Sequence, residues 1–232
     1  MAGSIVLAAI LLKLGTYGLL RLRIKFDYMN LSVFSILRSI SLVGAVVSRL
    51  ICIRQRDLKS LVAYSSVAHM GLGVAGIITN SIWGWGGVLV MILAHGLCSS
   101  GLFNLVSIIY ECSGSRRFYI RSGLISVFPK LSFWCFLLIS ANMAAPPSPN
   151  LLGELVLITR ILIYRFSLVW LVLIITFMAA AYCLVLYTIT QHGGSARFIN
   201  RLVPISSRNF SSIFFHFIPL SILILKSDFI YY

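Results

Sequence analysis

Acidic residues are scarce in this chain. Only five aspartates and glutamates occur among 232 residues, against 19 lysines and arginines, and charged residues make up 10% of the total. A soluble domain carries charge at roughly a quarter of its positions. Together with a hydrophobic content of 59% and a mean hydropathy of +1.00, this scarcity excludes an ordinary soluble domain and predicts an all-α polytopic membrane protein.

Sequence patterns for metal, disulfide or substrate chemistry are also missing. The five cysteines are scattered without a CxxC pair, so we expect no iron–sulfur centre, structural zinc or disulfide framework. The sequence contains no Ser/His/Asp arrangement and no glycine-rich phosphate loop. The net charge of +14 does not indicate nucleic-acid binding, because the basic residues cluster in short gaps between apolar runs, as membrane topology requires.

Long apolar runs predict about seven transmembrane helices in one domain, 1–232, with expected segments 2–21, 31–52, 59–79, 84–109, 126–164, 166–190 and 210–229. The gaps alternate between the two sides of the membrane, so the basic residues can be sorted into two groups of eleven and six. The larger group is Arg49, Arg54, Arg56, Lys59, Arg116, Arg117, Arg121, Lys130, Arg197, Arg201 and Arg208, and the smaller is Arg21, Arg23, Lys25, Arg160, Arg165 and Lys226. The excess predicts that the larger group faces the matrix or cytoplasm and that the C-terminus faces outward.

The fifth segment contains the stretch "NMAAPPSPNLLGELV", residues 142–156, in which three prolines fall between positions 146 and 149. Proline removes a backbone donor and forbids a continuous helix. Unwound backbone at membrane depth survives only where it is buried in protein or lines a wet cavity. We therefore expect a helix broken near 142–150, with Ser148 and Pro149 starting the second half. Glu154 then lies one to two turns into that half.

Four ionisable side chains fall near the middle of four different segments: Lys13, His69, His95 and Glu154. Placing such a group at the bilayer centre costs roughly 2.5–3.5 kcal/mol, which makes each one a functional candidate. The remaining acids lie in gaps or at segment ends. Because the four groups share roughly one depth, the pattern predicts a polar chain that runs sideways through the bundle, where a proton passes between side chains and water.

The motifs around these residues resemble those of a known family. The stretches "DLKSLVAYSSVAHMG", "MILAHGLCSSGLFNL" and "LLGELVLITR" are similar to the antiporter-like membrane subunits of respiratory complex I. The "DLK…YSS…H" run is shared with bacterial relatives, including multisubunit sodium/proton antiporters. The "ECSGSRR" loop and the "TQHG" end of the sixth segment resemble mitochondrial members. The resemblance extends over essentially the whole chain.

This resemblance implies two inverted five-helix repeats, each with one broken helix and a central hydrophilic axis. The family's relay lysine matches Lys13, its second-repeat histidines match His69 and His95, and its glutamate in the second broken helix matches Glu154. Such a subunit pumps protons when quinone is reduced elsewhere in complex I, and it binds no NADH, metal or other cofactor. The implied partners are antiporter-like subunits 2 and 5, accessory subunits and lipids. The implied location is the mitochondrial inner membrane, with the C-terminus on the intermembrane-space side.

The sequence departs from the family pattern in length. Family members are about twice as long, and this sequence begins where their eighth helix begins, so most of the first repeat is missing. A shortened gene annotation, a split gene and a fragment are the alternatives, and a separate chain could supply the missing repeat. Smaller departures are Thr16, where the family usually has glycine, and the extra Arg38 and Arg49. We interpret both arginines as near-interface charges whose stems reach the headgroups.

Three hypotheses for the function follow. The first is a proton-conducting subunit of the NADH:ubiquinone reductase, with no redox centre in this chain. The second is a subunit of a sodium/proton antiporter, which would support sodium-dependent uptake without a quinone-linked driver. The third is a truncated structural remnant that only scaffolds its neighbours, against which an upstream reading frame for further spans would argue.

Overall fold

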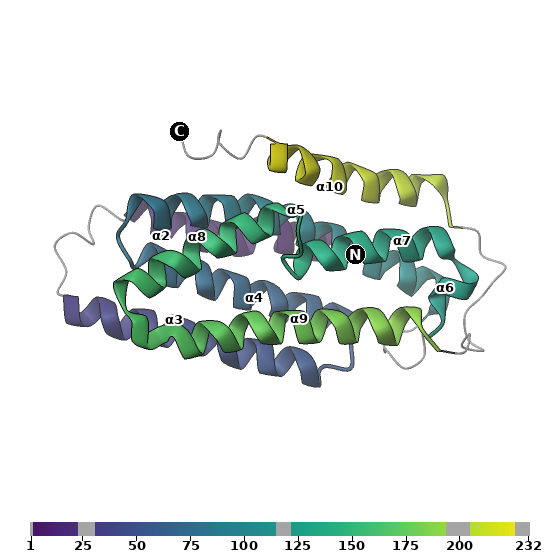
Figure 1. Cartoon of the computed structure of the whole chain (residues 1–232). Coiled ribbons are helices and arrows are strands. Elements are labelled where there is room, and N and C mark those ends of the chain that lie inside the picture. Colours follow the sequence, from purple (N-terminus) through teal and green to yellow (C-terminus); the bar gives the residue numbers. More distant parts are fainter. Residues whose placement is uncertain (1, 23–30, 115–121, 194–204, 226–232) are drawn as a thin grey trace.

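The computed structural model describes residues 2–22, 31–114, 122–193 and 205–225, and within these ranges it contains helices and no β-strand. The all-α prediction is confirmed. The long helices lie roughly along one common direction (Figure 1). The elements are α1 (Ala2–Val6), η1 (Leu7–Leu11), α2 (Leu12–Arg21), α3 (Leu31–Arg54), α4 (Leu58–Ile77), α5 (Ile82–Ser113), α6 (Leu124–Val127), α7 (Pro129–Asn142), α8 (Pro149–Tyr164), a 3₁₀ turn (Phe166–Leu168), α9 (Val169–Gln191) and α10 (Ser207–Leu225).

Six helical stretches in the described residues are long and apolar enough to span a membrane. They are Gly3–Arg21, Ser32–Arg54, Leu58–Ile77, Ile82–Cys112, Phe166–Gln191 and Ser207–Leu225. A further crossing is divided between α7 and α8, which have 14 and 16 residues and are individually too short. The expected segment 126–164 is thus split in the structure, and the last four residues of the expected segment 210–229 lie outside the described residues.

The crossing formed by α7 and α8 is interrupted in the middle, and side-chain hydrogen bonds stabilise the break. Helix α7 ends at Asn142 and α8 begins at Pro149. The Ser148 hydroxyl accepts a hydrogen bond of 3.4 Å from the amide of Leu151, so it caps the second half as expected. The Asn150 side chain donates to the carbonyl of Ala141 at 2.8 Å, which ties the start of α8 back to the end of α7.

The first crossing contains a widened turn that the apolar pattern does not predict. Residues Leu7–Leu11 form one turn of π-helix between α1 and α2, and the amide of Leu12 donates to the carbonyl of Leu7, five residues earlier. Such turns insert one extra residue into an α-helix and are frequent at functional sites. Lys13 lies directly after this turn.

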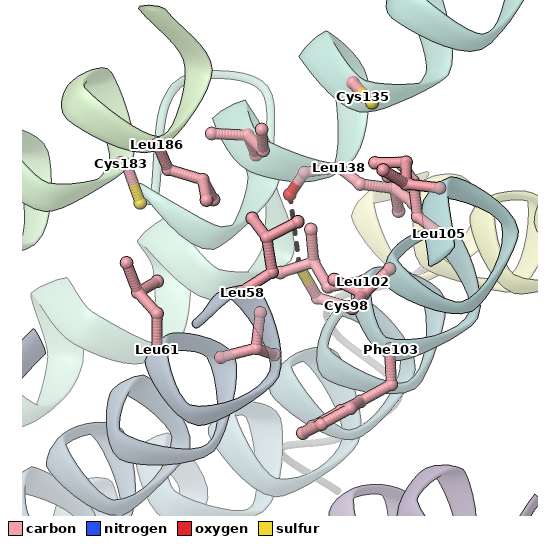
Figure 2. Packing of buried hydrophobic residues seen from close by; sticks show 14 of the residues in the cluster. Leu58, Leu61, Cys98, Leu102, Phe103, Leu105, Cys135, Leu138, Cys183 and Leu186 are labelled. Atoms are coloured by element: carbon pink, nitrogen blue, oxygen red, sulfur yellow. Dashed lines mark hydrogen bonds between the residues drawn. The ribbon is translucent and has the colours of Figure 1, made fainter. Parts of the chain in front are cut away.

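The buried apolar side chains form two separate clusters at opposite ends of the bundle. The first apolar cluster surrounds the start of α5 and the end of α8, and includes Leu72, Ile77, Val88, Met91, Leu157, Ile161 and Ile175. The second apolar cluster surrounds the end of α5 and the start of α4 and α7, and includes Leu58, Leu61, Leu102, Leu105, Leu138 and Leu186. Figure 2 shows leucines of α4, α5, α7 and α9 gathered in this second cluster.

Buried polar and charged residues lie between the two clusters along the chain. In α5, His95 falls between Met91 of the first cluster and Cys98 of the second. In α4, His69 immediately precedes Met70 of the first cluster, and in α8 Glu154 lies three residues before Leu157 of the same cluster. The bundle therefore has a polar layer near mid-length, closed on each side by aliphatic packing.

Candidate functional site

Glu154 and His69 form the centre of the polar layer. The Oε1 atom of Glu154 lies 3.1 Å from Nδ1 of His69. Glu154 is 7% exposed and His69 is fully buried, so this contact is made inside the bundle and away from lipid. The contact joins the second half of the broken crossing to α4, and it depends on the break because Glu154 lies in the second turn after Pro149.

His95 extends the site from α4 to α5. Its ring centroid lies 4.4 Å from that of His69, with the rings tilted by 39°. His95 is completely buried, and neither of its ring nitrogens has a hydrogen-bond partner among the described residues. Buried polar atoms are normally hydrogen-bonded, so these nitrogens are placed to bind water or to exchange a proton.

Lys13 enters the polar layer from α2 and is 3% exposed. Its ammonium donates to the carbonyl of Ala8, in the π-turn, and to the hydroxyl of Ser99 at 3.1 Å. Gly96 faces the same part of the first crossing, since a methyl group added there would make ordinary van der Waals contact with the carbonyl oxygen of Ala9 at 3.5 Å. Lys13 lies within electrostatic range of both imidazoles. The structure thus brings all four predicted residues into one layer of the bundle.

Arg49 corrects one interpretation from the sequence. It was expected near an interface, with its head among the lipid headgroups, but it is 1% exposed. Its Nη2 lies 3.0 Å from Nε2 and 3.3 Å from Nδ1 of His69, and its Nη1 donates to the hydroxyl of Tyr182 at 2.6 Å. The Asn142 amide donates to the same hydroxyl at 3.0 Å. The polar layer therefore reaches α3, α7 and α9 as well.

Arg38 was also expected at an interface, and it too is fully buried. Its guanidinium lies 3.7 Å from the ring centroid of Tyr164 and donates to the carbonyl of Ile78 at 3.3 Å. These partners lie at the ends of α8 and α4, far along the chain from His69 and Glu154. Arg38 is thus a second buried arginine outside the polar layer.

A helical stripe on α3 could have revealed both arginines from the sequence. Arg38, Leu42, Ala45, Arg49 and Cys52 follow one another at spacings of three or four residues, and all are buried. Such a stripe marks the face of a helix that packs on its neighbours. Ser99 carries a similar signal, because it lies four residues after His95 on the same face of α5. No comparable signal marks Tyr182, whose role depends on where α9 packs.

The apolar clusters restrict how the polar layer connects to the ends of the bundle. A cavity of about 20 Å³ lies within the second apolar cluster, lined by Leu58, Val62, Leu102, Leu105, Val106, Ile109, Cys135, Ile139, Leu186 and Thr190. Such a volume holds about one water molecule, and its lining offers few polar partners. The arrangement can therefore pass a proton sideways between helices more easily than along the bundle axis.

The described residues contain no group of three or more His, Cys, Asp or Glu side chains that could hold a metal ion. All five cysteines are buried and free.

Comparison with known proteins places the chain in a family. The model of the family described as NADH:quinone oxidoreductase/Mrp antiporter, transmembrane, matches residues 1–181. The chain is 47% identical over 229 residues to the NADH-ubiquinone oxidoreductase chain 4 of Lumbricus terrestris, covering 99% of this chain and 51% of the relative. The chain thus spans about half the length of this relative.

Two solved structures share the fold. A chain of respiratory complex I from Thermus thermophilus with bound NADH matches with a TM-score of 0.76 and 21% identity, covering 83% of this chain and 40% of the other. A chain of the Mrp complex from Dietzia sp. matches with a TM-score of 0.82 and 15% identity, covering 94% and 49%. These two structures show the fold, and the family model, which matches more than half of the chain, shows that the chain belongs to the NADH:quinone oxidoreductase/Mrp antiporter family of membrane proteins.

Proposed function

We propose that this chain is part of a proton-translocating membrane subunit of respiratory complex I, which couples electron transfer from NADH to ubiquinone to proton pumping. The sequence relative is named for that enzyme, and the similarity extends over nearly all 232 residues of this chain. The observation that carries the proposal is the buried contact of 3.1 Å between Glu154 and His69, in which Glu154 is the only buried acid among the described residues. Such a costly intramembrane pair is typical of proton relays.

In this proposal the polar layer is the proton path. Lys13 and Glu154 are the two charged ends of this path, and His95 and His69 lie between them. An imidazole can accept a proton on one nitrogen and release one from the other, which suits the two central positions. Water completes the path at the ring nitrogens of His95. The chain supplies neither a redox centre nor a cofactor site, and the redox reaction takes place elsewhere in the complex.

The same proposal gives the location and partners. The chain lies in the mitochondrial inner membrane, beside antiporter-like subunits 2 and 5, accessory subunits and lipids.

Replacing Glu154 by Gln tests the proposed function. The amide keeps the size and the hydrogen bonding of the side chain but cannot be ionised. In membrane vesicles that contain the assembled complex, we expect Glu154→Gln to lower the number of protons pumped per NADH oxidised while the amount of complex stays normal. Glu111→Gln is the matched control, because Glu111 is an exposed acid at the end of α5. A normal proton-to-electron ratio in Glu154→Gln would refute the proposal.

The likeness to the Mrp complex, which covers 94% of this chain, supports a second candidate function. In that case the chain belongs to an antiporter that exchanges sodium for protons. Sodium-dependent proton movement in vesicles that have no NADH or quinone would support this alternative. Proton movement that requires NADH oxidation and is indifferent to sodium would exclude it.

A further inference from the structure

Arg49 introduces a permanent positive charge into the polar layer, next to a residue that the proposed path requires to change its protonation. Its Nη2 is 3.0 Å from Nε2 of His69, and its Nη1 is held at 2.6 Å by the hydroxyl of Tyr182. The guanidinium also lies 5.0 Å from the centroid of the Tyr182 ring. The amide of Asn142 donates to the same Tyr182 hydroxyl at 3.0 Å, so the partner that binds Arg49 is itself held by α7.

The chemistry of these donors decides which nitrogen of His69 carries the proton. Arginine is always charged and has only donors, so the imidazole nitrogen that it binds must be an acceptor. The nearer nitrogen is Nε2, whereas Nδ1 lies 3.1 Å from the carboxyl oxygen of Glu154. An imidazole with its proton on Nδ1 satisfies the shorter Arg49 contact and the Glu154 contact together, and it leaves the longer separation of 3.3 Å between Nη2 and Nδ1 without a hydrogen bond. The opposite tautomer would direct an N–H of His69 at an N–H of Arg49.

We propose that Arg49 is a positioning residue that holds His69 as the Nδ1–H tautomer and so directs its proton toward Glu154. While the guanidinium stays in place, Nε2 cannot take up the second proton of the imidazole, for instance from His95. Proton transfer from His95 to Nε2 of His69 then requires the Arg49 guanidinium to move away from Nε2. Its hydrogen bond to the Tyr182 hydroxyl can hold it during this movement. This role in transport rests on the proposed proton-translocating function.

Other charges face the same imidazole and belong to the argument. Lys13 acts on His69 from α2, His95 stacks on it from α5, and the backbone of Asn142 approaches it from α7. The Lys13 ammonium is hydrogen-bonded to Ala8 and Ser99, and a neutral His95 adds no charge next to His69. Of the described charged groups around His69, only Arg49 and Glu154 come within 3.5 Å of its ring nitrogens.

A double-mutant cycle between Arg49 and His69 tests the positioning role. Arg49→Met keeps the length of the side chain but removes its donors, and His69→Asn keeps one hydrogen-bonding amide near the position of Nδ1. In the complete complex in vesicles, we expect each single variant to lower the protons pumped per NADH by about twofold or more, and the double variant to pump no worse than His69→Asn alone. Arg49→Lys, which restores one charged donor, should recover part of the loss.

Arg38→Met is the matched control, because it removes a second buried guanidinium that does not contact the polar layer. We expect it to leave the protons pumped per NADH unchanged once the data are normalised to assembled complex. If Arg49→Met does not assemble, the cycle is run with Arg49→Lys, for which we expect a smaller loss that is again not additive with that of His69→Asn.

Two outcomes would overturn the inference while leaving the proposed function intact. One is normal pumping by Arg49→Met, and the other is a double variant whose loss is the product of the two single losses. Failure of the proposed function would be recognised separately, by Glu154→Gln pumping normally.

Discussion

At the residue scale, the chain shows how the sequence of a membrane protein exposes its own site. Lys13, His69, His95 and Glu154 could be singled out because a charge at mid-span is costly and therefore rare. Their contacts could not be foreseen, because these depend on how α2, α4, α5 and α8 turn toward one another. Arg49 was misread for a related reason. It lies only five residues before the end of α3, where a long side chain can point outward or inward, and only its place on the buried stripe distinguishes the two.

Ser99 should matter to the function through Lys13. Its hydroxyl is one of two acceptors that hold the Lys13 ammonium, at 3.1 Å. Losing a hydrogen bond to a charged group costs about 1.5–3 kcal/mol, so we expect Ser99→Ala to lower proton pumping per NADH by at least about twofold. Ser100→Ala is the control, because the Ser100 hydroxyl bonds only to the carbonyl of Leu97 in its own helix. Equal pumping by the two variants would show that Ser99 does not support Lys13.

At the scale of the elements, the sequence predicted the break in the fifth segment from its prolines and the cap from Ser148. It did not predict that a side chain would bridge the break, as Asn150 does with the carbonyl of Ala141. It also gave no sign of the π-turn at Leu7–Leu11, because a run of leucines and alanines suits an α-turn equally well. The choice between the two turns is made by packing and by the acceptor that the wider turn offers to Lys13.

The close approach of α8 to α5 depends on Gly153. A methyl group on Gly153 would lie 3.2 Å from the backbone nitrogen and 3.3 Å from the Cα of Met91, both in α5. Backbone atoms cannot easily give way, so Gly153→Val should push α8 outward and carry the neighbouring Glu154 with it. Overpacking of this kind costs about 1–3 kcal/mol, and we expect less assembled complex on native gels and weaker pumping per complex.

The control for this substitution is Gly44→Val in α3, where an added methyl group meets nothing within 4 Å. The close approach would be unimportant if both valine variants assembled and pumped equally well.

At the scale of the whole molecule, the ends of the helices give the structure two faces. The turn between α3 and α4 and the starts of α7 and α10 lie at one end, and the turns between α4 and α5 and between α8 and α9 lie at the other (Figure 1). The described basic residues of the larger group, Arg49 excepted, belong to the first end. Arg23, Lys25, Arg116, Arg117, Arg121, Arg197, Arg201 and Lys226 lie outside the described residues.

Cysteine labelling can assign the two faces to the two sides of the membrane. We expect an impermeant maleimide to reach Arg56→Cys from the matrix side, and Ile82→Cys and Phe166→Cys from the intermembrane space. All three positions are exposed, and the five native cysteines are buried, so the background from this chain should be low. Labelling of all three variants from one side would contradict the topology, and exchanged sides would reverse the orientation inferred from the basic residues.

The two apolar clusters have a consequence at this scale. A dry aliphatic layer is where most of a transmembrane voltage falls, at about 2.3 kcal/mol for each charge and 100 mV. With such a layer on each side, the polar layer is insulated from both aqueous faces in the present conformation. In the proposed function, proton uptake and release then involve separate openings of the two clusters, and a proton that moves sideways between the helices does little work against the voltage.

The π-turn determines which side chains of the first crossing face the interior of the bundle. Ala8 and Lys13 are five residues apart, a separation that in a regular α-helix rotates two side chains by about 140° from each other. The extra residue of the widened turn brings both onto the buried face, together with Thr16 and Leu20. Removing one residue, such as Ala9, would restore an ordinary helix without twisting its two halves apart. The lysine would still face the interior, but it would lose the hydrogen bond that its ammonium now donates to the carbonyl of Ala8 in the widened turn.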